Sequence, residues 1–191
     1  CMDFMRGEEI QCFGVLRNYP EIRPPFTIIV LSSHTKYIHM DAQERIAGSI
    51  TTLSGQIYEA LISSTSIGKS IHTDSLPPSG EAAQDSLEAA AAVVRDAGFL
   101  RALLMPRFME VLLDTTPEQR KLFIESAIIA EDLTAFKDYQ HLFGTSGQPF
   151  IVIGDPGRSK IFQRMATILE IEVPDFTAIT GETEIDDLHI K

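Results

Sequence analysis

The sequence predicts an α/β fold, and three observations support this class. Residues 26–31 are a short apolar run rich in β-branched side chains, which is typical of a buried strand. Residues 81–136 carry apolar side chains mainly at helical spacing. Residues 149–169 then return to a strand, a glycine turn and a helix in succession. Together these patterns favour helices packed on a sheet.

The first part of the chain predicts three antiparallel strands followed by a helix. After the run at 26–31, the polar residues 32–34 interrupt the apolar pattern, and 35–40 have the composition of a second strand. Residues 41–44 predict a turn and 45–52 a third strand. Ser54 is a suitable N-cap for the helix that follows. The polar break therefore falls at the tip of the first hairpin.

The middle of the chain predicts three helical segments. The first covers residues 81–97 and ends at Gly98. The second covers 99–113, with an interruption expected at Pro106. Thr116 and Gln119 have the spacing of a capping box, with proline at the first helical position, so a third helix should start there and run to about Phe136.

The last part predicts a strand at 149–153, a tight turn at 154–157 and an amphipathic helix at 159–169. A strand, a glycine turn and a helix N-terminus in this order can seat an anion or a nucleotide. The acidic residues from about 177 onwards show little pattern.

Composition restricts the possible functions. The 191 residues suit one domain, or one lobe of a larger enzyme. Sixteen basic against 27 acidic residues give a net charge of −11, which argues against nucleic acid and anionic membrane as partners. The two cysteines have no metal-ligand spacing, so free thiols and a cytoplasmic location are expected. No apolar stretch approaches the ~20 residues of a membrane span.

Two segments could contact phosphate or a nucleotide. In residues 31–36, small hydroxyl side chains at a hairpin tip would expose backbone N–H groups, and Lys36 would add positive charge. The alternative is an ordinary polar hairpin loop. In residues 154–159, the glycines permit close approach of a ring or phosphate, and the helix dipole favours anions. The alternative is an ordinary strand-to-helix connection.

Residues 6–9 place two carboxylates beside a glycine near the start of the chain. A phosphoryl-transfer enzyme needs a carboxylate to orient the attacking hydroxyl and accept its proton. Paired acids are more often a solvated surface, so this pattern leaves both interpretations open. Cys12 is better explained as a core residue than as a nucleophile, and the five histidines show no ligand spacing.

Taken together, these segments resemble the 2-dehydro-3-deoxygalactonokinase family of actin-like sugar kinases. Residues 5–11 are similar to its Met-Arg-Gly-Glu-Glu-x-Gln block, and residues 31–37 to its Pro-Gly-Thr-His-Ser-Lys-Trp block. Residues 52–58 resemble its Met-Thr-Gly-Glu-Leu-Phe element, and 151–169 its adenosine-binding strand, turn and helix. The resemblance covers nearly the whole chain in the family's order.

The resemblance implies a ribonuclease-H-like (actin-like ATPase) lobe with a three-stranded antiparallel meander, at least one further strand and several flanking helices. It implies ATP and Mg²⁺ as cofactors and phosphorylation of the terminal 6-hydroxyl of a sugar acid, 2-dehydro-3-deoxygalactonate. The implied residues fall into three groups: Glu8 or Glu9 as the catalytic base; Arg6 for substrate binding; and Ser33, His34, Thr35, Lys36, Gly154, Asp155, Pro156 and Ser159 for nucleotide binding.

The sequence departs from the family pattern in three places. Ser32-Ser33 replaces Gly-Thr, and Asp155-Pro156 replaces the Gly-Gly of many sugar kinases. The Asp-x-Gly-Thr phosphate loop of the first lobe is not present in these 191 residues. We therefore interpret residues 1–191 as a single domain, the C-terminal lobe of a two-lobe kinase, which would be inactive without its N-terminal lobe.

Two other functions stay open. The chain could be a stand-alone lobe that binds a nucleotide or a protein partner, or a related kinase with another acceptor. An exposed face that lacks its lobe could also be covered by a second copy, as a homodimer.

Overall fold

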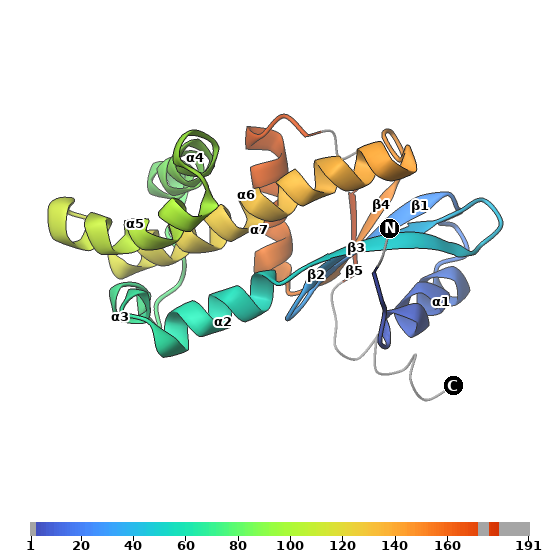
Figure 1. Cartoon of the computed structure of the whole chain (residues 1–191), viewed down its shortest axis with the longest axis horizontal. Coiled ribbons are helices and arrows are strands. Elements are labelled where there is room, and N and C mark those ends of the chain that lie inside the picture. Colours follow the sequence, from blue (N-terminus) through green and yellow to red (C-terminus); the bar gives the residue numbers. More distant parts are fainter. Residues whose placement is uncertain (1–2, 172–175, 180–191) are drawn as a thin grey trace. The chain divides into compact units, whose positions relative to one another are not determined.

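The computed structural model describes residues 3–171 and 176–179. The chain divides into two compact units (Figure 1). Unit 1 comprises residues 1–53, 135–160 and 172–191, and unit 2 comprises residues 54–134 and 161–171. Two helices, α6 (Pro117–Phe143) and α7 (Pro156–Ile168), contribute residues to both units.

Unit 1 is built on a five-stranded mixed sheet with the strand order β3-β2-β1-β4-β5. The first three strands form an antiparallel meander: β1 (Phe26–Leu31), β2 (Thr35–Met40) and β3 (Ile46–Thr52). The other two, β4 (Phe150–Gly154) and β5 (Phe176–Ile179), run parallel to β1. Every residue of β1 is buried, as expected for a strand at the centre of a covered sheet.

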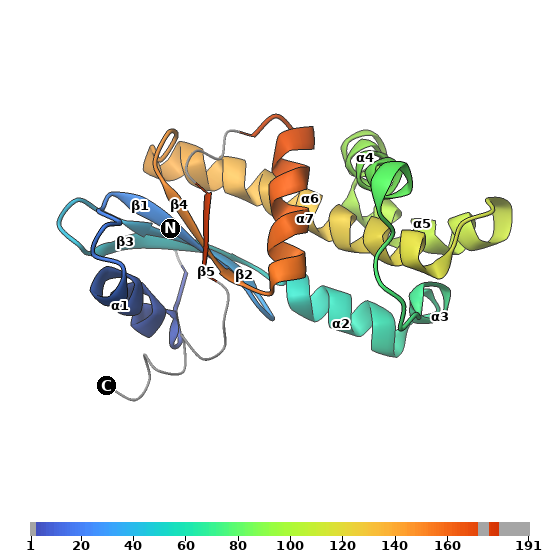
Figure 2. The same ribbon diagram turned by 180° about the vertical axis from the view of Figure 1, so that it is seen from behind.

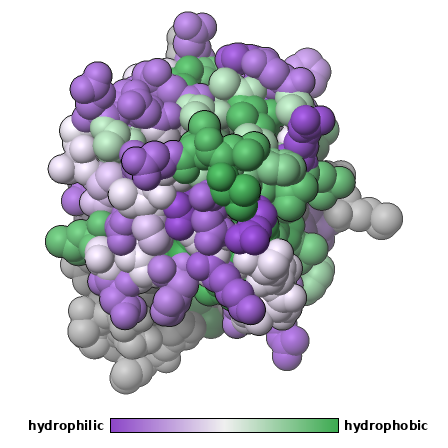
Figure 3. All heavy atoms as spheres, turned by 90° about the vertical axis from the view of Figure 1, so that its left-hand side faces the viewer, coloured by the Kyte–Doolittle hydropathy of each residue, from purple (hydrophilic) through white to green (hydrophobic). Residues whose placement is uncertain are grey.

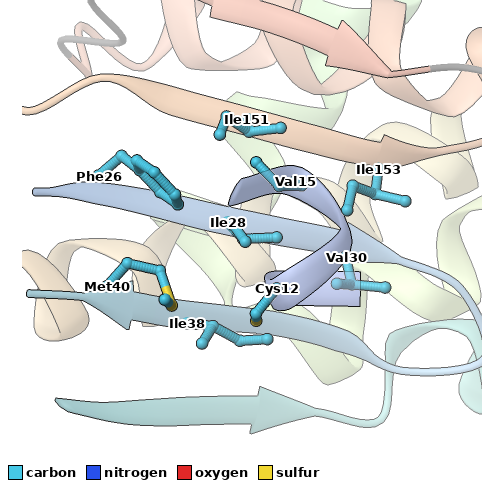
Figure 4. Close-up of a cluster of buried hydrophobic side chains, with 9 residues drawn as sticks. All are labelled: Cys12, Val15, Phe26, Ile28, Val30, Ile38, Met40, Ile151 and Ile153. Atoms are coloured by element: carbon cyan, nitrogen blue, oxygen red, sulfur yellow. The ribbon is translucent and has the colours of Figure 1, made fainter. Parts of the chain in front are cut away.

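Helix α1 (Glu8–Asn18) covers one face of this sheet (Figure 4). Cys12 and Val15 point from the helix into side chains of the three central strands, among them Ile28, Ile38 and Ile151. Burial raises the pKa of Cys12 to about 12, with further increases from the charges of nearby carboxylates. The thiol is therefore held in its neutral form, which agrees with its interpretation as a core residue.

The opposite face of the sheet carries an aromatic layer from the last turns of α6. Phe136 and Tyr139 stack on each other and contact Tyr37 of β2, with ring centroids 5.0–5.9 Å apart. The hydroxyl of Tyr139 lies 3.0 Å from the buried hydroxyl of Thr27. The sheet of unit 1 is thus covered on both faces.

Unit 2 is helical. It contains α2 (Ser54–Ser64), α3 (Ile67–Ile71), α4 (Gly80–Ala97), α5 (Phe99–Leu112) and the first turns of α6. One apolar cluster joins α4, α5 and α6, and another joins α2, α3, α5 and α6. Figure 2 shows the course of these helices from behind. None of the helices within the described ranges is long and apolar enough to cross a membrane.

The predicted strands and most helices are confirmed within one or two residues, but three predictions about helices need correction. Helix α7 begins at Pro156 rather than at Ser159, so the predicted turn at 154–157 is shorter. Helix α5 continues through Pro106, because that residue and Ala102 are buried and tertiary packing offsets the lost hydrogen bond. Helix α6 extends to Phe143 rather than Phe136. Helix α1 had no sequence prediction, and its weak amphipathicity explains why. The weakly patterned end includes β5 up to residue 179, and residues 180–191 lie outside the described part.

Candidate functional site

The parallel pairing of β1 with β4 brings the two predicted nucleotide segments together. Leu31 at the end of β1 pairs with Gly154 at the end of β4, so both strands end at the same edge of the sheet. The hairpin tip, Ser32 to His34, and the turn before α7 both continue from this edge. The sequence separates these segments by more than a hundred residues, and the sheet topology makes them neighbours.

Arg158 connects the two segments directly. Its Nη1 donates to the carbonyl oxygen of Ser32 at 2.6 Å, and its Nη2 lies 3.5 Å from the hydroxyl oxygen of Thr35. Both acceptors are neutral, and within the described part of the chain the Arg158 guanidinium forms no ion pair. The edge therefore carries a guanidinium group that is not in direct contact with a carboxylate of these residues. Sequence reasoning missed this residue, although it follows the glycine turn immediately.

Asp155 occupies the N-terminus of α7. Its Oδ1 accepts the backbone N–H of Arg158 at 2.9 Å, which is the bond an N-cap residue makes to the third helical position. Pro156 stands at the first helical position, where its missing N–H costs nothing. The N-terminus of α7, where the sequence predicts a bound anion or nucleotide, is thus capped by the carboxylate of Asp155.

Ser159 has a structural contact in the same turn. It is 2% exposed, and its hydroxyl donates to the carbonyl oxygen of Asp155 at 2.9 Å. At the hairpin tip, by contrast, Ser32 and Ser33 are exposed and His34 is half-buried. The Ser33 hydroxyl lies 3.1 Å from Nδ1 of His34. The exposed hydroxyl groups of this edge are therefore at the hairpin tip.

Gly154 is required by close packing of backbone. A Cβ at this position would lie 2.6 Å from the carbonyl oxygen of Leu31 and 2.9 Å from its Cβ. A side chain there would push β4 away from β1 at the point where the hairpin tip begins. The role of Gly154 visible here is to hold the two segments together, and its contact with a nucleotide stays a prediction.

Glu8 and Lys36 form an ion pair on the α1 side of the sheet. Lys36 is 4% exposed, and its Nζ donates to the carbonyl oxygen of Phe4 at 2.6 Å and lies 3.6 Å from Oε1 of Glu8. Lys36 and Thr35 are adjacent strand residues and therefore point to opposite faces. Lys36 consequently approaches the hairpin from the α1 side, while Arg158 contacts Thr35 from the other.

The two carboxylates that follow Gly7 both fold back onto backbone N–H groups. Glu8 Oε2 accepts from Arg6 at 2.7 Å, and Glu9 Oε2 accepts from Gly7 at 2.6 Å. Burial raises the pKa of Glu8, but backbone hydrogen bonds and the charge of Lys36 outweigh it and hold the pKa below its ordinary value. Glu8 is thus ionised near neutral pH, and its position is fixed by a buried cation.

Asp3 is a second acidic residue beside this pair, and sequence analysis did not select it. Its carboxylate accepts hydrogen bonds from Ser49 at 2.6 Å and from Thr51 at 2.9 Å, both on β3. Burial raises the pKa of Asp3, and these hydroxyl groups, a backbone N–H and Lys36 lower it by more. Asp3 thus connects the segment before α1 to the sheet. Its position next to the family-like block at residues 5–11 is the sequence feature that could have identified it.

Arg6 is exposed, and its side chain forms no ion pair with any described residue. It lies two residues before Glu8 in the chain, and its contact with a substrate stays a prediction. The described residues contain no group of three His, Cys, Asp or Glu side chains that could hold a metal ion.

Comparison with known proteins gives one family and one fold. The family model described as 2-keto-3-deoxy-galactonokinase matches residues 1–183. A crystal structure from Sinorhizobium meliloti, provisionally described as a 2-dehydro-3-deoxygalactonokinase, superposes with a TM-score of 0.72 at 16% sequence identity. That alignment covers 97% of this chain and 58% of the other, so this chain spans little more than half of its length. No curated protein matches the chain.

Proposed function

Because the chain belongs to the 2-keto-3-deoxy-galactonokinase family, we propose that it forms the nucleotide-binding lobe of a sugar-acid kinase. The reaction is transfer of the terminal phosphoryl group of ATP to the 6-hydroxyl of 2-dehydro-3-deoxygalactonate. The observation that carries the proposal is the meeting of the hairpin tip, Arg158 and the α7 turn at one edge of the sheet.

We assign the sheet of unit 1 to the ribonuclease-H-like fold of the actin-like ATPases. The support is its strand order, with an antiparallel meander followed by two strands parallel to β1. The chain is then the C-terminal lobe, and the N-terminal lobe comes from sequence outside these 191 residues. The 58% coverage of the Sinorhizobium meliloti chain is consistent with this division.

The charges at the sheet edge suggest how a nucleotide is oriented. Asp155 caps α7 and repels phosphate from that helix end, whereas the guanidinium of Arg158 adds positive charge at the hairpin. The phosphates therefore belong beside Ser33 and His34, and the nucleoside belongs beside Asp155 and Pro156. In this arrangement Ser159 and Gly154 support the turn from within.

Mg²⁺ is bound in kinases through one or two carboxylates together with phosphate oxygens. The described residues provide no three-ligand cluster, so the ion would enter with the nucleotide rather than occupy a cage of protein ligands. When bound, it supplies charge neutralisation at the transferred phosphoryl group. Of the Glu8 and Asp155 carboxylates, Glu8 is the one that could contact it, because Asp155 lies on the nucleoside side.

Glu8 is the candidate base. Its low pKa makes it a weak proton acceptor, but a loose phosphoryl-transfer transition state needs mainly orientation of the attacking hydroxyl. Glu8 would hold the sugar hydroxyl in line and accept its proton late in the transfer. Lys36 keeps the Glu8 carboxylate in place, and the free guanidinium of Arg6 suits the carboxylate of a sugar acid. Glu9 is the second candidate base.

A lobe alone lacks half of such a site, so we expect these 191 residues to bind a nucleotide weakly and to show little turnover by themselves. The alternative, a stand-alone module that binds a nucleotide or a partner, predicts the same weak binding. It differs because adding an N-terminal lobe would produce no kinase activity.

Calorimetric titration with ATP and Mg²⁺ tests the site. Arg158→Met should weaken binding by about tenfold, because a charge-assisted contact is worth roughly 1.5 kcal/mol or more. Arg45→Met is the matched control: Arg45 is an exposed arginine of unit 1 that pairs with Asp41 at the β2–β3 turn. Equal affinity of the two variants, or no binding by the parent chain, would reject the nucleotide site.

A further inference from the structure

An exposed apolar stripe follows helix α5 in unit 2. Leu100, Leu104, Phe108 and Val111 are spaced at four, four and three residues, which places them on one face of the helix. Their exposed fractions are 82%, 46%, 42% and 63%. Figure 3 faces the α5 side of Figure 1, and hydrophobic side chains gather there in one patch. We call these four residues the α5 stripe.

The stripe is separate from the packed side of the same helix. Ala102, Pro106 and Met109 are the buried residues of α5, and the cluster around two of them includes Phe123 of α6. The helix is therefore apolar on both sides, although only one side packs within the described residues. A helix that is apolar all round is typically buried on all sides.

The patch is large for a surface that stays in water. Leu112 and Leu113 extend the stripe, at 72% and 58% exposed. Weighted by their exposed fractions, the six side chains together present on the order of 700 Å² of apolar surface, taking ~200 Å² for each large side chain. This exceeds the largest patch on a typical monomer, ~300–600 Å². With flanking polar residues it approaches the ~800 Å² that each partner contributes to a standard interface.

The charges at its two ends are opposite. Arg101 lies beside Leu100 at the start of α5, and Asp114 follows Leu113 beyond its end. Neither forms an ion pair with another described residue, whereas Arg107 pairs with Glu110 at 2.6 Å between them. If two such helices pack antiparallel about a two-fold axis, each Arg101 faces the Asp114 of the other copy. The stripe is thus complementary to itself in charge as well as in apolarity.

We propose that the α5 stripe is the interface of a homodimer, in which two copies pack their α5 helices antiparallel about a two-fold axis. In such an isologous contact each pair of residues occurs twice. The Leu104 side chains would face the Val111 side chains of the other copy, with the two Phe108 rings near the axis. The proposal is independent of the kinase assignment, because it uses no residue of the sheet edge.

Sedimentation equilibrium of the chain, from about 1 to 100 µM, tests the proposal. The parent should dimerise, and Phe108→Ser should weaken the dimer by at least about tenfold, since truncating a central aromatic anchor costs ≥ ~2 kcal/mol. Arg101→Asp alone and Asp114→Arg alone should each weaken it about tenfold, because every reversal creates two like-charge contacts. The double variant Arg101→Asp/Asp114→Arg should recover to within about threefold of the parent.

The single and double charge-reversal variants distinguish a loss of dimerisation from a loss of folding. Arg101, Asp114 and Phe108 are all exposed, and circular dichroism of each variant should match that of the parent. A parent that stays monomeric throughout would overturn the proposal. The stripe would then be covered by residues of the protein outside this chain, or by another partner. A dimer that Phe108→Ser leaves intact, or a double variant as weak as the single ones, would also overturn it.

Discussion

Replacing Gly154 by alanine should destabilise unit 1, because the added Cβ would collide with backbone and because residues with a side chain rarely adopt its φ of +156°. The added Cβ would lie 2.6 Å from the carbonyl oxygen of Leu31, where an ordinary contact begins at 3.4 Å, so the strand ends must separate by about 0.8 Å. Both partners are backbone of paired strands at the end of the β1–β4 ladder, and neither can move aside like a flexible side chain. Overpacking of this kind costs about 1–3 kcal/mol.

The loss should be measurable as a lower free energy of unfolding in a urea titration. The positive φ of Gly154 adds strain to this cost, and part of it, ~0.4–1 kcal/mol, is offset because alanine has less freedom than glycine in the unfolded chain. We therefore expect a net loss of about 1–2 kcal/mol with an unchanged slope. The same shift displaces Ser32 relative to Arg158, so ATP affinity should fall as well.

Gly157→Ala is the matched control three residues away. Its Cβ would meet only Oδ1 of Asp155, at 3.0 Å, and alanine is favoured over glycine within a helix. Its unfolding free energy should stay within about 0.5 kcal/mol of the parent. If Gly154→Ala is as stable as the parent, or if both variants lose equally, close packing of β1 against β4 does not explain the glycine.

Three further predictions follow from single contacts. Thr116→Ala should lower the unfolding free energy by about 1 kcal/mol, because it removes half of the capping box with Gln119; urea titration with Gln119→Ala as its partner variant measures this. Tyr139→Phe should cost about 1–2 kcal/mol by the same assay, because the buried hydroxyl of Thr27 loses its partner, and Phe retains the ring packing. The pKa of Asp3 is lowered in the fold, so its contribution is present above its ordinary value of 3.8 and is lost as the pH falls through the lowered value. Asp3→Asn should therefore reduce the loss of stability below about pH 4, and an unchanged pH profile would contradict the hydrogen bonds assigned to it.

Much of the fold could be predicted from local patterns. The strand at residues 26–31 was visible because it is buried on both faces and so forms an unbroken apolar run. The start of α6 was visible because Thr116 and Gln119 satisfy orphan N–H groups through local contacts alone. Features of this type depend on neighbours in sequence, which is why pattern reasoning found them.

The missed features depend on tertiary contacts. Pro106 stays inside α5 because packing of that helix offsets the hydrogen bond that proline removes. The sequence prediction considered only the lost hydrogen bond. Helix α6 runs past its predicted end because Tyr139 and Phe143 lie in an aromatic layer on the sheet, whereas their polar neighbours obscured the period. No local pattern contains either contact.

The candidate site shows the same division. Sequence reasoning predicted the hairpin and the α7 turn as two separate nucleotide-binding segments. The parallel pairing of β1 with β4 places them side by side. It could not foresee that Lys36 is buried and paired with Glu8, or that Asp155 caps α7. Arg158 was missed because an arginine after a turn is commonplace, and only its bond to Ser32 distinguishes it.

Amide chemical-shift mapping by NMR, with ATP and Mg²⁺ added to the isotopically labelled chain, tests the central claim most directly. Our account predicts that the amides of residues 32–36 and those of residues 154–159 shift together, with one shared binding curve, because both segments line one edge of the sheet. Shifts confined to one of the two segments, or located elsewhere in the chain, would contradict a nucleotide site at this edge.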